Sequence, residues 1–451
     1  MLANSHMHVL FGMAHAGYLR NFEAGIAALL DRGHRVTVAT GRVRPETAPI
    51  VARLQVRGTF ILNEGAPALT DPPDERGARL RAALDYWFYL QPHFRTTPAL
   101  RQRALNDAPR FAVRMEHAPP FIRRAVAAGL RHLERRRPVP KPLLDFMRTA
   151  KPDVVLLTPL IYLKSTQILW LRAARRIGVP TVFCVHSWDN LTTKGTLHDM
   201  PTRVLVWNQA QCAEAEALHG VDQARCAVTG ATAFDHWFST RPTMSREEFL
   251  RSTGLPPGRK VLLYLCSSRF IAKGEVNWIE EWIRALRAAP DQAVREALVI
   301  VRPHPSVVDT PQVSRLGDPA VRLFPQHNEN PVSDEARMRY FHSLYYSDAV
   351  VGLNSTSMIE AAILDKPVLS IRAPGSARVR KTLHFAHIED GLLTVAPDLD
   401  THVQQLSEVL NGETPLQRSR DFVEAFVRPL GLDHPAGIRM AELVEALVAS
   451  G

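Results

Sequence analysis

The feature that most constrains the fold of this chain is a regular alternation of short apolar segments with helical segments. The first example runs from the apolar segment 8–12 through a helical pattern over 18–31 to a second apolar segment at 35–39. A β-α-β unit of about 30 residues requires two parallel strands joined by a right-handed crossover. The sequence therefore predicts the α/β class, with parallel sheets.

The same alternation occurs in both halves of the 451 residues, and it predicts two domains. We expect an N-terminal Rossmann-like domain over 1–240, a C-terminal one over 241–430 and a closing helix over 431–451. Two facing domains of this kind hold a ligand in the cleft between them. Predicted strands lie at 8–12, 35–39, 59–62, 153–158, 180–185, 203–207 and 226–229, and then at 260–265, 298–302, 321–324, 349–353, 367–371 and 392–395.

The net charge of +10 is concentrated in one segment. The chain has 55 basic and 45 acidic residues, and residues 76–137 contain 14 arginines and four acidic residues. The rest of the chain therefore has 41 basic and 41 acidic residues and no net charge. Five prolines divide the segment, which predicts a basic helical insertion over about 76–150 in the N-terminal domain. It also carries the aromatic run 86–89, Phe94, Phe111 and Phe121. Such helices suit an anionic membrane surface, and no recognisable nucleic-acid module is present.

The cysteines and the hydropathy pattern bear on the compartment. Cys184, Cys212, Cys226 and Cys266 include no CxxC pair, so we expect buried, reduced thiols. No run of 18 or more apolar residues occurs, so no transmembrane helix is expected. The prediction is a cytoplasmic protein, and peripheral attachment to the inner face of the cell membrane is a hypothesis.

Three strand ends of the second half predict a phosphate site. After the strand at 349–353, hydroxyl residues begin a helix whose free N–H groups suit a diphosphate, and Glu360 can accept hydrogen bonds from a ribose. The strand at 298–302 carries Arg302 and His304 to its carboxyl end, where they can bind a nucleotide phosphate. The predicted binding residues are Ser267, Ser268, Arg269, Lys273, Arg302, His304, Asn354, Ser355, Thr356, Ser357 and Glu360.

Two strand ends of the first half supply candidate bases and further ligand contacts. His15 lies in the first strand-to-helix turn among small residues, and the ordinary pKa of histidine suits a general base near neutral pH. The segment 185–195 holds a second candidate base, Asp189, and a tryptophan that can stack on a sugar. The predicted catalytic residues are His15, Asp189 and Glu23, and the predicted contact residues are Gly17, Tyr18, His186, Trp188, Asn190 and Lys194.

Several nucleotide-binding and metal-binding motifs are absent from the sequence, namely GxxxxGK[ST], GxGxxG and HExxH. The single Asp-x-Asp pattern, Asp398–Asp400, is typical of a helix start. We therefore expect chemistry without a metal ion.

The segment 8–40, the Arg302–Pro305 element and the block 354–371 together resemble the GT-B superfamily of glycosyltransferases. The block also resembles the donor loops of lipid A disaccharide synthase, capsule-polysaccharide transferases and CDP-glycerol glycerophosphotransferases. The resemblance covers most of the chain except 76–137. It implies that the N-terminal domain binds the acceptor, and that the C-terminal domain binds the nucleotide-sugar donor through the residues named above. The retaining branch has a second glutamate eight positions on, and here that position is Val368, so inversion is favoured.

The function implied by the resemblance is a metal-independent, inverting glycosyltransferase with no cofactor beyond its co-substrate. It would move a sugar from a UDP-linked or CMP/CDP-linked donor to a cell-surface glycan or a lipid-linked acceptor. The alternatives are a CDP-glycerol-type glycerophosphotransferase and an enzyme like UDP-N-acetylglucosamine 2-epimerase, which needs no acceptor. The non-catalytic alternative is a nucleotide-sugar-binding or nucleic-acid-binding protein.

Overall fold

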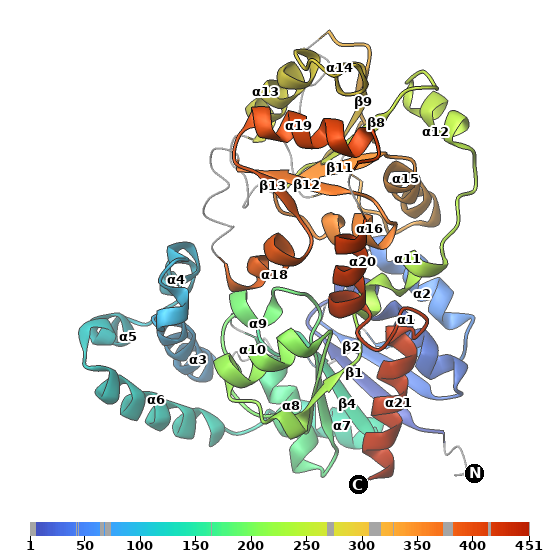
Figure 1. Cartoon of the computed structure of the whole chain (residues 1–451). Helices are drawn as coiled ribbons and strands as arrows, with labels where there is room; N and C mark the ends of the chain where they lie inside the picture. Colours follow the sequence, from blue (N-terminus) through green and yellow to red (C-terminus); the bar gives the residue numbers. More distant parts are fainter. Residues whose placement is uncertain are drawn as a thin grey trace. The chain divides into compact units, whose positions relative to one another are not determined.

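The computed structural model divides the chain into two compact units (Figure 1). Unit 1 comprises Met1–Asp235 and Phe426–Gly451, and unit 2 comprises His236–Ala425. The predicted boundary lay after residue 240, and the predicted final helix was a separate element; in the structure that helix belongs to unit 1. The structure describes residues 6–41, 43, 45–63, 67, 74–163, 165–267, 275–305, 317–327, 329–372, 382–413 and 416–450.

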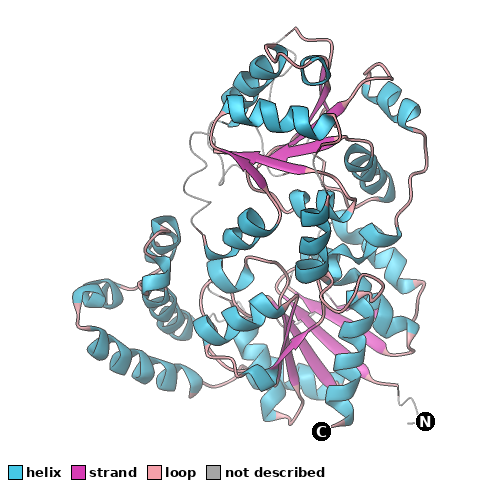
Figure 2. Ribbon diagram, in the orientation of Figure 1, coloured by secondary structure: helices cyan, strands magenta, loops and turns pink. Residues whose placement is uncertain are grey.

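Unit 1 is built on a seven-stranded parallel sheet in the order β3-β2-β1-β4-β5-β6-β7, with helices on its faces (Figure 2). Its central strands are buried along their length because both faces of the sheet are covered. The strands are β1 (His8–Met13), β2 (Arg35–Thr40), β3 (Phe60–Asn63), β4 (Val154–Thr158), β5 (Thr181–Cys184), β6 (Arg203–Val206) and β7 (Cys226–Val228). The main helices between them are α1 (Leu19–Asp31), α2 (Ala48–Gln55), α7 (Lys141–Ala150), α8 (Gln167–Arg176), α9 (Asn190–Thr193) and α10 (Gln209–His219).

The last helix, α21 (Ala436–Ala449), packs closely on α1. A Cβ added at Gly437 would lie 2.6 Å from the backbone of Ala24, so only glycine permits this approach. The Asp235 carboxylate accepts hydrogen bonds from the backbone N–H groups of Ala436 (3.0 Å) and Gly437 (2.7 Å). These contacts attach the C-terminal segment to unit 1.

The basic insertion consists of short helices, as predicted, and forms a lobe beside the sheet of unit 1 (Figure 1). Its helices are α3 (Glu75–Phe88), α4 (Pro98–Leu105), α5 (Arg110–Arg114) and α6 (Pro120–Arg135). Pro98 and Pro120 each occupy the first position of a helix, where the missing N–H carries no penalty. The aromatic run 86–89 is buried, whereas Phe111 and Phe121 are exposed.

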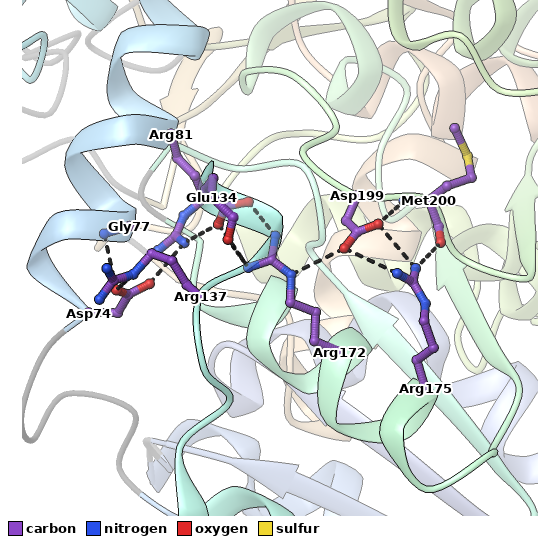
Figure 3. Close-up of polar contacts among 9 residues, drawn as sticks. All are labelled: Asp74, Gly77, Arg81, Glu134, Arg137, Arg172, Arg175, Asp199 and Met200. Carbon is purple, nitrogen blue, oxygen red and sulfur yellow. Dashed lines mark hydrogen bonds and ion pairs between the residues drawn. The ribbon is translucent and has the colours of Figure 1, made fainter. Parts of the chain in front are cut away.

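A buried network of charged side chains fastens this insertion to the α/β core (Figure 3). Glu134 of α6 accepts hydrogen bonds from Arg81 of α3 (2.8 Å) and from Arg172 of α8 (3.0 Å). Arg172 also donates to Asp199 (3.1 Å), which in turn accepts from Arg175 (3.1 Å). Because Arg81 and Glu134 are both about 1% exposed, each charge depends on its partners. The insertion is therefore held rigidly against unit 1.

Unit 2 contains a second parallel sheet, in the order β10-β9-β8-β11-β12-β13. Ser245 and Glu248 form the predicted capping box at the start of α12, and Asp398 caps α19 as expected for a helix start. The strands are β8 (Val261–Leu265), β9 (Leu298–Arg302), β10 (Val321–Leu323), β11 (Ala349–Gly352), β12 (Val368–Ile371) and β13 (Thr394–Ala396). The helices include α12 (Arg246–Thr253), α13 (Glu275–Arg287), α15 (Asp334–Tyr345), α16 (Ser357–Ile363), α18 (Leu383–Gly391), α19 (Leu399–Leu410) and α20 (Gln417–Phe422).

The prediction of two parallel α/β domains is confirmed, but the prediction of four reduced cysteines is wrong for two of them. Cys212 and Cys226 form a disulfide, since the packing of α10 on β7 brings their Cα atoms to 5.9 Å. Cys184 and Cys266 are buried free thiols. Among the described residues, no helix has both the length and the apolar composition needed to cross a membrane.

Candidate functional site

The candidate donor residues of unit 2 lie at the carboxyl ends of its central strands. Strands β8 and β11 are neighbours, and the strand order reverses between them. In doubly wound sheets, ligands bind outside the carboxyl ends of the strands at such a reversal. Ser267 follows β8, Arg302 ends β9 and Asn354 follows β11, so three separate motifs converge on this edge.

Arg302 is the most distinctive of these residues. It is 5% exposed, and its guanidinium carbon lies 4.3 Å from the centre of the Tyr340 ring of α15. The Tyr340 hydroxyl donates a hydrogen bond to Glu360 of α16, so β9, α15 and α16 are joined through polar groups. The Nη1 atom of Arg302 is buried, and the described residues offer it no hydrogen-bond partner. A buried cationic donor without an acceptor is costly, and an anionic ligand would satisfy it.

The first residue after β8 is held by a buried carboxylate. Glu275, at the start of α13, accepts hydrogen bonds from the Ser267 N–H (2.8 Å), from the Ser267 hydroxyl (3.1 Å) and from the Tyr264 hydroxyl (3.2 Å). Burial raises the pKa of Glu275 to about 7. The Ser267 hydroxyl, predicted to bind the donor, is therefore engaged within the protein.

Of the other predicted donor residues, four lie near the strand ends and are at least half-buried, one is exposed, and three lie outside the described residues. Asn354 is buried, and Ser355, Ser357 and His304 are half-buried near the strand ends. Thr356 is exposed, and the Ser357 N–H donates to the Ser355 hydroxyl at 3.3 Å. Ser268, Arg269 and Lys273 lie outside the described residues.

In unit 1 the first strand-to-helix turn brings three aromatic rings together. His15 stacks on Tyr18 with ring centres 4.3 Å apart, and Tyr18 meets the edge of His186 at 4.9 Å. Gly17 allows this stack, because a Cβ there would lie 2.9 Å from Nδ1 of His15. Burial raises the pKa of Tyr18 to about 12 and lowers that of His186 to about 4, so both are neutral at pH 7.

The two predicted carboxylate bases of unit 1 both have cationic partners. Asp189 forms an ion pair with Lys194 (3.0 Å) and accepts hydrogen bonds from Ser187 (2.6 Å) and Thr193 (2.9 Å). Glu23 of α1 accepts two hydrogen bonds from Arg53, at 2.6 and 3.3 Å. These three partners of Asp189 come from its own segment, 186–194, which also contains His186. The partner of Glu23 instead comes from a different element, helix α2.

Besides His186, two further predicted acceptor contacts are buried, Trp188 and Asn190. Trp188 is 6% exposed, which leaves little of its ring for a sugar to stack on. Asn190 is fully buried and donates to the carbonyl of Ile161 at 2.9 Å. Their burial does not support the predicted direct contacts, and we interpret both as residues that shape the loop.

The insertion contacts the segment that follows these residues. Arg103 of α4 donates to the carbonyl of Thr193, and the Gly195 N–H donates to the Tyr89 hydroxyl (2.9 Å). The Thr196 N–H donates to Asp85 of α3 at 2.9 Å. The position of the 190–196 segment thus depends on the insertion.

Sequence reasoning missed Tyr340 and Glu275. Tyr340 sits in the middle of a helix, and no local pattern distinguishes it from an ordinary core tyrosine. Glu275 begins a helix, where acidic residues are common for reasons of the helix dipole alone.

Comparison with protein-family models gives no match, and no curated protein matches the sequence. Solved structures share the fold at 9–13% identity. A putative UDP-N-acetylglucosamine 2-epimerase from Listeria monocytogenes has a TM-score of 0.55 at 12% identity, and covers 99% of this chain and 97% of its own. A glycosyltransferase from Rickettsia africae has a TM-score of 0.53 at 9% identity, with 99% of both chains covered. The UDP-GlcNAc 2-epimerase of Methanocaldococcus jannaschii, solved with UDP-GlcNAc and UDP, has a TM-score of 0.52 at 10% identity, covering 98% of this chain and 100% of its own.

These likenesses extend over the whole chain and identify the class of fold. The protein has the two-domain GT-B fold, with two Rossmann-like α/β units, and the predicted resemblance is confirmed at this level.

Proposed function

We propose that this protein is a nucleotide-sugar enzyme, and specifically a metal-independent, inverting glycosyltransferase. The observation that carries the proposal is Arg302, a buried guanidinium at a strand's carboxyl end, for one nitrogen of which the described part of the chain supplies no hydrogen-bond partner. A nucleotide phosphate supplies the acceptor that this nitrogen lacks. Structures of the same fold have been solved with UDP or a UDP-sugar bound, which favours such a ligand here.

The proposed reaction is a direct displacement at the anomeric carbon of the donor. The acceptor hydroxyl oxygen bonds to this carbon as the bond from the carbon to the nucleotide phosphate oxygen breaks. A base takes the hydroxyl proton, and the nucleotide leaves with both electrons of the broken bond. Arg302 and His304, together with Arg269 and Lys273, are proposed to stabilise the leaving charge. His15 and Asp189 are the proposed bases, and Asp189 forms an ion pair with Lys194 at 3.0 Å.

The acceptor is proposed to be a cell-surface glycan or a lipid-linked sugar. The supporting observation is the attachment of the basic insertion to the 193–196 segment, directly after Asp189 and Asn190. An insertion that bound an anionic surface would place this segment near lipid-linked substrates.

A second candidate function is 2-epimerisation of a UDP-sugar, because several of the similar structures are UDP-N-acetylglucosamine 2-epimerases. Such an enzyme binds the same donor but requires no acceptor. Incubation of the protein with UDP-N-acetylglucosamine alone separates the two: a new epimer favours the epimerase, and an unchanged sugar favours the transferase.

The donor is tested by the melting temperature of the full chain in UDP, CMP, CDP, GDP and dTDP. A nucleotide that binds only the folded protein at 100 times its Kd stabilises it by about 2.7 kcal/mol. We expect a pyrimidine nucleotide to raise the melting temperature. If no nucleotide changes the melting temperature, the proposed function fails.

Turnover of CDP-glycerol with the matching acceptor would instead indicate a glycerophosphotransferase. Binding of a nucleotide sugar with no turnover of any substrate would indicate a regulator.

A further inference from the structure

Helix α6 of the insertion has a buried side and an exposed side that differ sharply. The buried side carries Ala127 and Glu134, which are 8% and 1% exposed. On the other side, Phe121, Ala125, Ala128 and His132 are all exposed and recur at spacings of three and four, so they form one stripe. Phe121 is 72% exposed, an unusual state for a phenylalanine in a folded unit.

The two edges of this stripe have different chemistry. One edge adds Ile122 and Leu133, which are 39% and 58% exposed. The other edge carries Arg124, Arg131 and Arg135, all exposed, and the described residues provide no ion-pair partner for any of them. An exposed helix face with large apolar residues toward one edge, and with arginines that the described residues leave unpaired on the other, is the pattern of a helix that lies in a membrane interface.

The basic edge of α6 also borders a cavity of about 290 Å³. Arg131 and Arg135 line it, and so does Asp199, whose oxygens are already bound by Arg172 and Arg175. The remaining lining residues are Thr196, Leu197, Met200, Leu218, His219 and Gly220. Burial lowers the pKa of His219 to about 4, so it is neutral at pH 7. Among the described residues that line this cavity, Arg131 and Arg135 are therefore the charged side chains without an ion-pair partner, and a lipid phosphate has room there.

We propose that this exposed side of α6 binds the surface of an anionic membrane. Phe121, Ile122 and Leu133 enter the boundary between headgroups and acyl chains, and Arg124, Arg131 and Arg135 bind lipid phosphates. The buried bonds of Glu134 to Arg81 and Arg172 fix α6 to unit 1, so docking of the helix orients the whole unit. Membrane binding by α6 does not depend on the proposed function. Only its consequence, the delivery of a lipid-linked acceptor, rests on that function.

The test is flotation of the full chain with two kinds of vesicle, phosphatidylcholine alone and phosphatidylcholine with 30% phosphatidylglycerol. We expect binding to the anionic vesicles only, and weaker binding in high salt. The apolar variant is Phe121→Asp, and its control is Val56→Asp, because Val56 is 86% exposed but lies outside the insertion. The charge variant is Arg124→Glu/Arg135→Glu, and its control is Arg176→Glu/Arg251→Glu, which changes the net charge equally.

Each arginine near an anionic surface contributes about fivefold to binding, so the charge variant should bind at least about 20-fold more weakly. Phe121→Asp should also lose binding, and both controls should keep it. Unchanged melting temperatures would show that the variants fold. The proposal is overturned if the wild type ignores anionic vesicles, or if the controls lose as much binding as the α6 variants. It is also overturned if the α6 variants affect only self-association or only the binding of an RNA probe. Nucleotide binding is measured separately, so failure here leaves the proposed function standing.

Discussion

The guanidinium carbon of Arg302 lies 4.3 Å from the centre of the Tyr340 ring, and the Tyr340 hydroxyl is bound to Glu360. The ring supports the charge from one side through a cation–π contact. Burial lowers the pKa of Arg302, yet an arginine stays charged at any physiological pH. This relationship fixes a positive charge at the carboxyl end of β9 before any ligand arrives.

Loss of the Arg302 charge should weaken nucleotide binding. Replacement by Gln removes a charge-assisted hydrogen bond worth about 1.5–3 kcal/mol, so we expect the Kd for UDP to rise about 10- to 100-fold. Arg302→Lys keeps the positive charge but loses the planar guanidinium, so its Kd for UDP should lie between those of the wild type and Arg302→Gln. Titration calorimetry measures both, with Arg284→Gln on the exposed side of α13 as the control. An unchanged Kd in Arg302→Gln would remove Arg302 from the site.

Glu275 should make unit 2 less stable as the pH rises. Its folded pKa of about 7 is above the ordinary value of 4.5, so its contribution is complete below pH 4.5 and is lost as the pH rises through 7. Between pH 5 and 8 the loss amounts to about 2–3 kcal/mol. Glu275→Gln keeps an acceptor for the Ser267 N–H and does not titrate.

Scanning calorimetry at pH 5 and pH 8 measures this difference. The melting temperature of the wild type should fall relative to Glu275→Gln by about 5–10 °C over this range. Parallel behaviour of the two proteins would show that Glu275 is ionised throughout.

His402 should make the folded protein less stable as the pH falls, which is the opposite pH dependence to that of Glu275. It is fully buried in α19, neither ring nitrogen has a hydrogen-bond partner among the residues that the structure describes, and burial lowers its pKa to about 4. The unfolded chain takes up a proton below about pH 6.5 and the folded protein does not, so stability falls as the pH decreases from 6.5 toward 4. At pH 5 the loss is about 2 kcal/mol. In His402→Leu this part of the acid sensitivity should be absent, as measured by the melting temperature from pH 7 to pH 5; an equal decline in both proteins would contradict the assignment.

Glu134 should control the attachment of the insertion to unit 1. Removing one partner from a buried ion pair costs about 3–5 kcal/mol. Arg81 and Arg172 would both lose the Glu134 carboxylate, and each would keep one acidic partner, Asp74 and Asp199 respectively, so we expect a loss at the lower end of this range. In Glu134→Gln we expect limited proteolysis to cleave within 76–137 faster than in the wild type. Glu75→Gln, an exposed change in α3, serves as the control. Equal cleavage rates in all three proteins would show that the insertion is held by other contacts.

The positions of the strands along the chain were predictable because local patterns record them, whereas the order of the strands in each sheet was not predicted. The capping box of Ser245 and Glu248 and the strand ending at Arg302 depend on residues close in sequence. The disulfide between Cys212 and Cys226 was not predicted, since it needs the packing of a helix against a strand. Trp188 was predicted to stack on a sugar because its segment is rich in groups that recognise hydroxylated ligands, but its burial depends on distant parts of the chain. Tyr340 joins Arg302 to Glu360 only because three elements meet there.

Hydrogen exchange of the full chain with and without saturating UDP tests whether a nucleotide binds at the strand ends of unit 2, since exchange reports which backbone segments a ligand protects. We expect protection at the carboxyl ends of β8, β9 and β11, in peptides that contain Ser267, Arg302 and Asn354–Ser357. Protection confined to other segments, or none at all under saturating UDP, would contradict this binding site.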